Sequence, residues 1–95
     1  MSSSTEARFL KYVSMDTQSE EFKKEFPSTK KQLEFARFLA EELKALGIED
    51  ARVDQNGYVM ASIPSNIESD TAPAVGFISH MDTSPDAPGA NVRPR

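Results

Sequence analysis

Apolar residues recur at helical spacing in two separate parts of the chain. In the first part, Phe9, Leu10 and Val13 form one apolar stripe. Ser3 has a glutamate three positions later, an arrangement that fits a capping box at the start of a helix. These signals predict a first helix over residues 3–15.

The second stripe is longer and predicts a helix from Ser28 to Leu46. Charged residues occupy most of the opposite side of this helix, which is the pattern of a helix with one buried face. Ser28 or Thr29 can cap its start, and Gly47 is well placed for the left-handed conformation that ends many helices. The apolar stripe consists of Leu33, Ala36, Leu39, Ala40, Leu43 and Leu46.

A β-hairpin is predicted after the second helix. Residues 51–54 and 58–63 are the two strands, and the segment Gln55-Asn56-Gly57 between them contains the Asn-Gly pair that tolerates positive φ. Residues 74–79 are a continuous apolar run, which is typical of a strand covered on both faces. Such a strand needs neighbours on its edges.

The remaining segments are polar and rich in turn-forming residues. Residues 16–27 predict a loop with a short helical turn, and residues 64–73 and 82–95 predict loops. The order helix, helix, strand, strand, strand indicates an α/β or α+β layer, and we expect α/β, with helices packed on a mixed sheet that includes the hairpin. The expected core residues are Phe9, Leu10, Val13, Leu33, Leu39, Leu43, Leu46, Val75, Phe77 and Ile78.

Composition narrows the possible partners. The 95 residues carry a net charge of −4, and basic residues do not gather with aromatic ones, so we expect no nucleic-acid partner. An acidic surface also disfavours anionic membranes, and no apolar run reaches the roughly 20 residues of a membrane span. The absence of cysteine excludes disulfides and thiolate metal sites. Because the first residues lack the features of a secretory signal, we expect a cytoplasmic protein.

The single histidine, His80, directly follows the apolar run 74–79, and Asp82 lies two residues further on. In an extended chain these two side chains point the same way, so the carboxylate can accept the second imidazole N–H and fix the tautomer for metal binding. The spacing is also common in ordinary surface pairs, and both interpretations stay open from the spacing alone. Catalytic zinc takes about three protein ligands, of which this chain supplies one imidazole.

Other polar residues are weaker candidates. Asp86 is expected to be solvated, and the hydroxyl groups beside the histidine lack a second group that would orient a base for nucleophilic attack. Those hydroxyl residues are Ser79, Thr83 and Ser84.

The segment Gly76–Asp86 resembles the first metal-binding motif of the peptidase T group, the tripeptide aminopeptidases of the M20 metallopeptidase family. The similarity spans nearly the whole chain and keeps its order and spacing. Further similar segments are Phe9–Val13, Thr17–Ser19, Pro27–Gln32, Glu42–Gly47, Asn56–Val59 and Gly89–Pro94.

The resemblance implies a two-zinc aminopeptidase that releases the N-terminal residue of tripeptides. His80 would bind one zinc ion and Asp82 would orient that imidazole. The other ligands, the general base and a lid or dimerisation domain would come from later sequence. We therefore expect residues 1–95 to be the N-terminal portion of a zinc-peptidase catalytic domain, incomplete and inactive by itself. We also expect its uncovered strand to self-associate, and the resemblance allows a homodimer for the full-length enzyme.

Two alternatives remain open at the level of sequence. The first is another M20-type hydrolase, a dipeptidase or a deacylase, that uses the same His-x-Asp pair. The second is a non-enzymatic, free-standing scaffold module made of the two helices and the hairpin.

Overall fold

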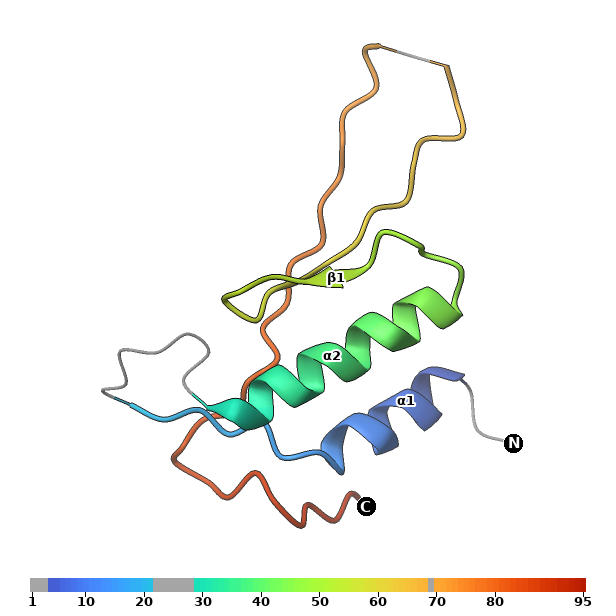
Figure 1. The fold of residues 1–95 in the computed structure, drawn as a ribbon. Helices are drawn as coiled ribbons and strands as arrows, with labels where there is room; N and C mark the ends of the chain where they lie inside the picture. Colours follow the sequence, from blue (N-terminus) through green and yellow to red (C-terminus); the bar gives the residue numbers. More distant parts are fainter. Residues whose placement is uncertain (1–3, 22–28, 69) are drawn as a thin grey trace.

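The computed structural model of the chain describes residues 4–21, 29–68 and 70–95 (Figure 1). Helix α1 (Ser4–Val13) and helix α2 (Lys30–Ala45) run side by side, and an antiparallel hairpin of strands β1 (Arg52–Val53) and β2 (Val59–Met60) packs against α2. The two predicted helices and the predicted hairpin are therefore confirmed.

Helix α1 is attached to α2 through two long polar side chains. Arg8 Nε donates to Glu42 Oε1 at 2.9 Å, and the Tyr12 hydroxyl donates to the same oxygen at 2.7 Å. The Tyr12 ring meets Phe35 edge to face, with 5.5 Å between ring centroids. Burial and the hydrogen bond to the Glu42 carboxylate raise the pKa of Tyr12 above its usual value. The capping box predicted at Ser3 lies outside the described residues.

Helix α2 ends as the sequence predicts but begins differently. Gly47 has a φ of 98°, and its N–H donates to the carbonyl of Lys44 while the N–H of Ile48 donates to the carbonyl of Leu43. This pair of bonds is a Schellman motif, which only a residue tolerant of positive φ closes without strain. At the other end, Thr29 holds the N-cap position, yet its side chain makes no capping bond and donates instead to the carbonyl of Gln18 at 3.1 Å.

The hairpin turn has one residue more than a two-residue Asn-Gly turn. The N–H of Gly57 donates to the carbonyl of Asp54 at 3.0 Å, and Gly57 has a φ of 83°. Asp54 Oδ1 also accepts the N–H groups of Asn56 and Tyr58. This is a three-residue loop that places glycine in the left-handed position, with an aspartate that satisfies the free N–H groups.

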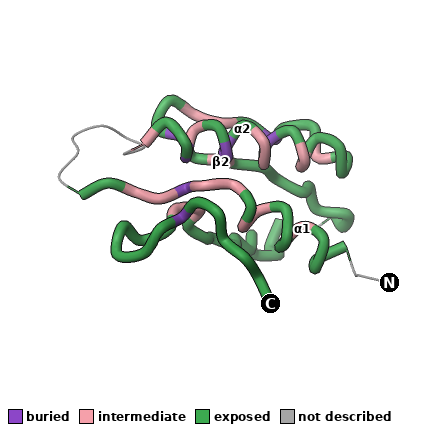
Figure 2. Tube along the Cα trace, turned by 90° about the horizontal axis from the view of Figure 1, so that it is seen from below, coloured by how far each residue is buried: buried purple, intermediate pink, exposed green. Residues whose placement is uncertain are grey.

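Among residues 4–21, 29–68 and 70–95, the buried apolar residues are few and differ from the predicted core. They are Phe35, Ala36, Ala40 and Ala51. The ten expected core residues are half-buried or exposed, so that prediction is wrong for this structure. On α2 the buried positions (purple in Figure 2) are Gln32, Phe35, Ala36 and Ala40, whereas its leucines are half-buried and Leu46 beyond its end is exposed.

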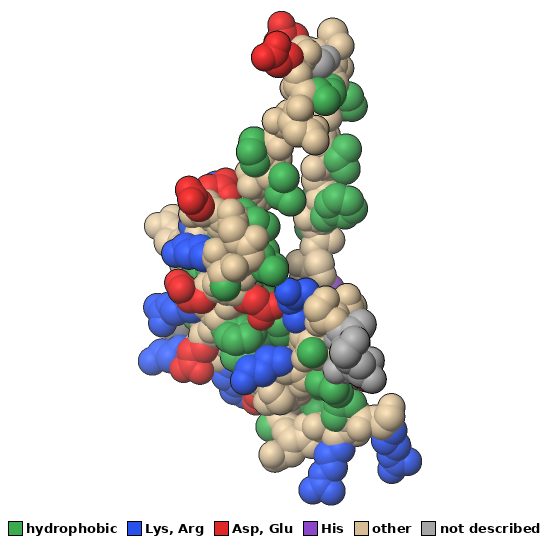
Figure 3. All heavy atoms as spheres, turned by 90° about the vertical axis from the view of Figure 1, so that its right-hand side faces the viewer, with side chains coloured by type: hydrophobic (Ala, Val, Ile, Leu, Met, Phe, Trp, Pro, Cys, Tyr) green, Lys and Arg blue, Asp and Glu red, His purple; other side chains and the backbone are tan. Residues whose placement is uncertain are grey.

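The strand predicted at residues 74–79 is absent from the described chain, and so is the mixed sheet. The only sheet among the described residues is the two-stranded hairpin. Residues 61–68 and 70–79 form an arm that projects from the helices and carries uncovered apolar side chains (Figures 1 and 3). Val75, Phe77 and Ile78 are 77, 97 and 100 % exposed. An extended segment becomes a strand only when a neighbouring segment pairs with its N–H and C=O groups, and no described segment does so here.

The uncovered arm enlarges the surface of the whole chain. The accessible surface is 8233 Å², against about 5,400 Å² for a compact folded protein of this mass. The radius of gyration, 15.8 Å, exceeds the value of about 13 Å typical of a 100-residue domain. Within residues 4–21, 29–68 and 70–95, neither helix combines the length and the apolar character needed to cross a bilayer.

Candidate metal centre

The His80 and Asp82 side chains lie together at the base of the projecting arm. His80 Nδ1 is 3.0 Å from Asp82 Oδ1 and 3.0 Å from the Asp82 carbonyl oxygen. Since both oxygens accept hydrogen bonds, Nδ1 carries the proton and the neutral imidazole has its lone pair on Nε2. The predicted alignment of the two side chains is confirmed. Their roles in metal binding stay predictions.

The donor set fits one zinc ligand and its orienting partner. The His80 side chain is 85 % exposed, which leaves Nε2 open to a metal ion, and the Asp82 side chain is 41 % exposed. In the part of the chain that the structure describes, no three His, Cys, Asp or Glu side chains cluster as a metal site requires. Binding of zinc by His80, with further ligands from elsewhere, stays a prediction.

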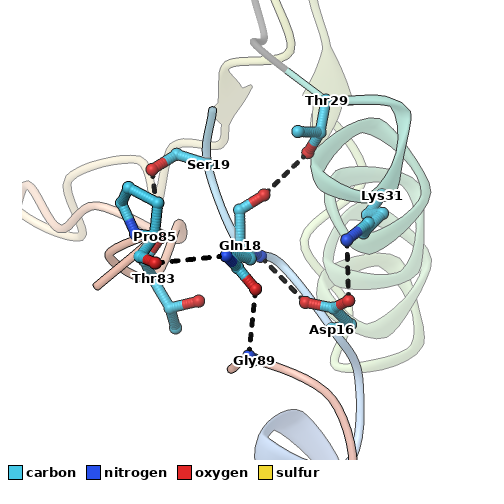
Figure 4. Close-up of polar contacts among 8 residues, drawn as sticks. All are labelled: Asp16, Gln18, Ser19, Thr29, Lys31, Thr83, Pro85 and Gly89. Atoms are coloured by element: carbon cyan, nitrogen blue, oxygen red, sulfur yellow. Dashed lines mark hydrogen bonds and ion pairs between the residues drawn. The ribbon is translucent and has the colours of Figure 1, made fainter. Parts of the chain in front are cut away.

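The residue after Asp82 is held by backbone hydrogen bonds. The N–H of Thr83 donates to the carbonyl of Thr17 at 3.2 Å, and its carbonyl accepts the N–H of Ser19 at 2.9 Å. The Ser19 hydroxyl also donates to this carbonyl, at 3.1 Å (Figure 4). These bonds make a short parallel bridge between Gln18 and Thr83. The segment 17–19 therefore serves as the support for the end of the His-x-Asp motif.

Asp16 connects the segment 17–19 to the start of α2. Asp16 Oδ1 accepts the N–H of Gln18 at 3.1 Å, and Asp16 Oδ2 accepts from Lys31 Nζ at 2.8 Å (Figure 4). The Lys31 ammonium and the Gln18 N–H hold the pKa of the Asp16 carboxyl below its usual range. Thr17, which lies between Asp16 and Gln18 in the sequence, is buried.

The Asp16–Lys31 contact gives a pH-dependent contribution to stability. Because the pKa of Asp16 is lower in the folded than in the unfolded chain, this contribution is present at neutral pH and is lost as pH falls from about 3.9 through the folded pKa. Lys31→Met is expected to raise the Asp16 pKa toward its ordinary value, as measured by NMR titration of the carboxyl carbon. The control Lys44→Met, on the surface pair with Glu41, should leave that pKa unchanged. An unchanged Asp16 pKa in Lys31→Met would contradict the assignment of Lys31 as a cause of the lowered pKa.

The weaker sequence candidates are Asp86 and the hydroxyl residues beside the histidine. Asp86 is exposed. The Ser79 hydroxyl donates to the carbonyl of His80 at 3.3 Å and is thus directed at the backbone. Asp16, Gln18 and Gly89 are not among the site residues that the sequence predicts. An aspartate two residues before a glutamine is the signal of a side-chain turn that could have marked this support.

Known proteins named peptidase T are similar in sequence to this chain. The chain is 58% identical over 89 residues to peptidase T of Alkaliphilus oremlandii, a match that covers 93% of the chain and 22% of that relative. It is also 58% identical over 88 residues to peptidase T of Clostridium botulinum strain Hall, covering 93% of the chain and 21% of the relative. The chain is similar to peptidase T. The resemblance seen in the motifs is thereby confirmed.

The match to peptidase T covers most of this chain but only part of each relative. A span of 93% of this chain includes Gln18, His80 and Asp82 wherever in the chain it begins. The chain spans about a fifth of the length of the peptidase T relatives it matches. No family model matches the chain.

Proposed function

We propose that the chain is part of a zinc-dependent aminopeptidase that releases the N-terminal residue of tripeptides. The supporting observation is the contact of 3.0 Å between His80 Nδ1 and Asp82 Oδ1, in a chain 58% identical to peptidase T. In this proposal His80 Nε2 binds one of two zinc ions, and Asp82 is the residue that keeps the imidazole in the binding tautomer.

The chemistry follows from the donor set. A zinc ion, when bound, polarises the scissile carbonyl and lowers the pKa of a water molecule that attacks it. The exposed imidazole edge of His80 faces solvent and is open to a metal ion. The carboxylate of Asp82 stabilises partial positive charge on the ring and makes Nε2 a stronger donor. In this proposal residues 1–95 are the N-terminal portion of the catalytic domain, and the remaining ligands lie elsewhere in the protein.

The partners in this proposal are a tripeptide substrate and zinc. A homodimer of the full-length enzyme and a cytoplasmic location also belong to it as predictions. Nucleic acid and membranes are not partners in this proposal, which is in keeping with the net charge of −4 and the absence of a basic aromatic patch.

Metal removal tests the proposal. The whole gene product that contains this chain is assayed with an unmodified tripeptide before and after a chelator. We expect the activity to fall to background on chelation and to return on addition of zinc, because the zinc ions generate the attacking water. The same tripeptide with an acetylated N-terminus is the matched control and should not be cleaved.

Each alternative function gives a different outcome of this assay. Hydrolysis of dipeptides or of N-acyl amino acids in place of tripeptides would assign the site to a dipeptidase or a deacylase. An intact protein without zinc and without hydrolysis of any of these substrates would support the scaffold module. The 95-residue chain alone should be inactive, since it holds one imidazole where about three protein ligands are needed.

A further inference from the structure

Gln18 is the residue at which three segments of the chain meet. Its N–H donates to Asp16, and its carbonyl accepts the hydroxyl of Thr29 at the start of α2. Its side-chain oxygen accepts the N–H of Gly89 at 3.2 Å, and its side-chain nitrogen lies 3.5 Å from the carbonyl of Pro85, a long contact (Figure 4). The backbone and the carboxamide of this one residue are therefore both engaged.

The carboxamide spans the turn that follows the His-x-Asp motif. Thr83, the residue directly after Asp82, is tied to Thr17 and Ser19 by its own backbone. Gly89, six residues further on, is tied to the Gln18 side chain. Both ends of the segment 83–89 are thus held by one short stretch, residues 17–19, which lies 64 to 71 positions away in the sequence.

Close approach at Gly89 makes this attachment specific. Gly89 is buried, and a Cβ atom placed on it would lie 2.5 Å from Asp16 Oδ1, 3.1 Å from Thr83 Oγ1 and 3.2 Å from Gln18 Cβ. Asp16 cannot yield easily, because its two carboxylate oxygens are bonded to Gln18 and Lys31. A side chain at position 89 would therefore push the segment 83–89 away from its support.

We propose that Gln18 is a positioning residue for the metal centre. This inference rests on the proposed function: if His80 binds zinc, Gln18 acts by holding the segment 83–89, and through Thr83 it sets where the Asp82 carboxylate stands relative to the imidazole. Gln18 touches neither metal nor substrate in this role. Groups that orient a metal ligand change metal affinity by about 10- to 100-fold when they are removed, and we expect the lower end of that range for a residue one step further away.

The test uses the whole gene product with Gln18→Ala and the matched control Gln55→Ala, which removes an exposed glutamine from the hairpin loop. Two quantities are measured in the metal-free protein: the zinc dissociation constant, by competition with a chelator, and the hydrogen exchange of the amides in residues 82–89. In Gln18→Ala we expect a zinc dissociation constant about 10-fold higher and faster exchange at Gly89. Gln55→Ala should match the wild type in both.

Saturating zinc distinguishes positioning from a general loss of structure. If Gln18 only places the ligand, tripeptide hydrolysis by Gln18→Ala should return toward the wild-type rate when zinc is raised above the new dissociation constant. Gly89→Ala disturbs the same contact from the other side and should raise the dissociation constant similarly. Should Gln18→Ala fail to fold, Gln18→Glu replaces it, since this variant keeps an acceptor for Gly89 but turns the donor to Pro85 into a negatively charged oxygen that faces the Pro85 carbonyl.

The outcomes separate this inference from the proposed function. A wild-type protein that binds zinc together with Gln18 and Gly89 variants that bind it equally well would overturn the positioning role and leave the proposed function intact. A wild-type protein that binds no zinc would overturn both. Weaker zinc binding that saturating zinc does not rescue would show a structural role only and would also overturn the inference.

Discussion

Replacing His80 with alanine is expected to lower tripeptide hydrolysis by the whole gene product at least about 100-fold. Loss of a residue that orients a metal ligand already costs about 10- to 100-fold in affinity or activity, and loss of the ligand itself should cost more. The chain has no second histidine that could substitute. The measurements are kcat/KM with a tripeptide and the zinc content of the purified protein.

Asp82→Asn is expected to lower tripeptide hydrolysis less than His80→Ala does. The asparagine oxygen can still accept from His80 Nδ1, but it lacks the negative charge that strengthens the Nε2 donor. We expect kcat/KM to fall by about 10- to 100-fold, which places this variant between the wild type and His80→Ala. Asp86→Asn, at an exposed carboxylate in the same loop, should retain nearly full activity. Full activity and full zinc content in His80→Ala would rule out the assignment of this histidine as a ligand.

Replacing Phe35 with alanine is expected to lower the free energy of unfolding of this chain by about 3 kcal/mol. Truncation of a buried phenylalanine costs about 3–5 kcal/mol, and the low end applies because the core here is small. Phe35 is 6 % exposed and contacts the rings of both Tyr12 and Phe38. Urea unfolding followed by circular dichroism should show a midpoint lower by about 2 M for a slope near 1.5 kcal/mol per molar.

Phe77→Ala is the matched control, because it makes the same chemical change at a side chain that is 97 % exposed. In a monomeric chain its effect on the free energy of unfolding should lie within about 0.5 kcal/mol of zero, as is usual for surface substitutions. A loss as large as that of Phe35→Ala would show that the arm is covered in solution, for example by a second copy of the chain. Sedimentation of the wild-type chain would then show an assembly larger than a monomer.

The α2 core shows why sequence predicts elements better than cores. The leucine stripe correctly predicts a helix there, since helical spacing depends on the sequence itself. The stripe does not reveal which part of the apolar face meets the hairpin. That choice depends on how Tyr12, from α1, and the hairpin approach α2, and it places Phe35 inside while Leu46 stays 56 % exposed.

The strand predicted at residues 74–79 is an element that the sequence predicts and the described chain lacks. An apolar run indicates a segment that needs cover, and the exposed Phe77 and Ile78 agree with that need. Whether the run becomes a strand depends on a partner that the described residues do not supply. The need for cover is a property of the local sequence, whereas the pairing is a property of the whole fold.

The sequence by itself determined the two helices, the Schellman end at Gly47, the hairpin turn and the contact between His80 and Asp82. All of these depend on residues within a few positions of each other, where periodicity, turn chemistry and the alternation of an extended chain decide the outcome. Only the tertiary structure decided that Gln18 meets Gly89, 71 positions later. A contact of that range follows from the way the loops fold back on α2, and no local pattern encodes it.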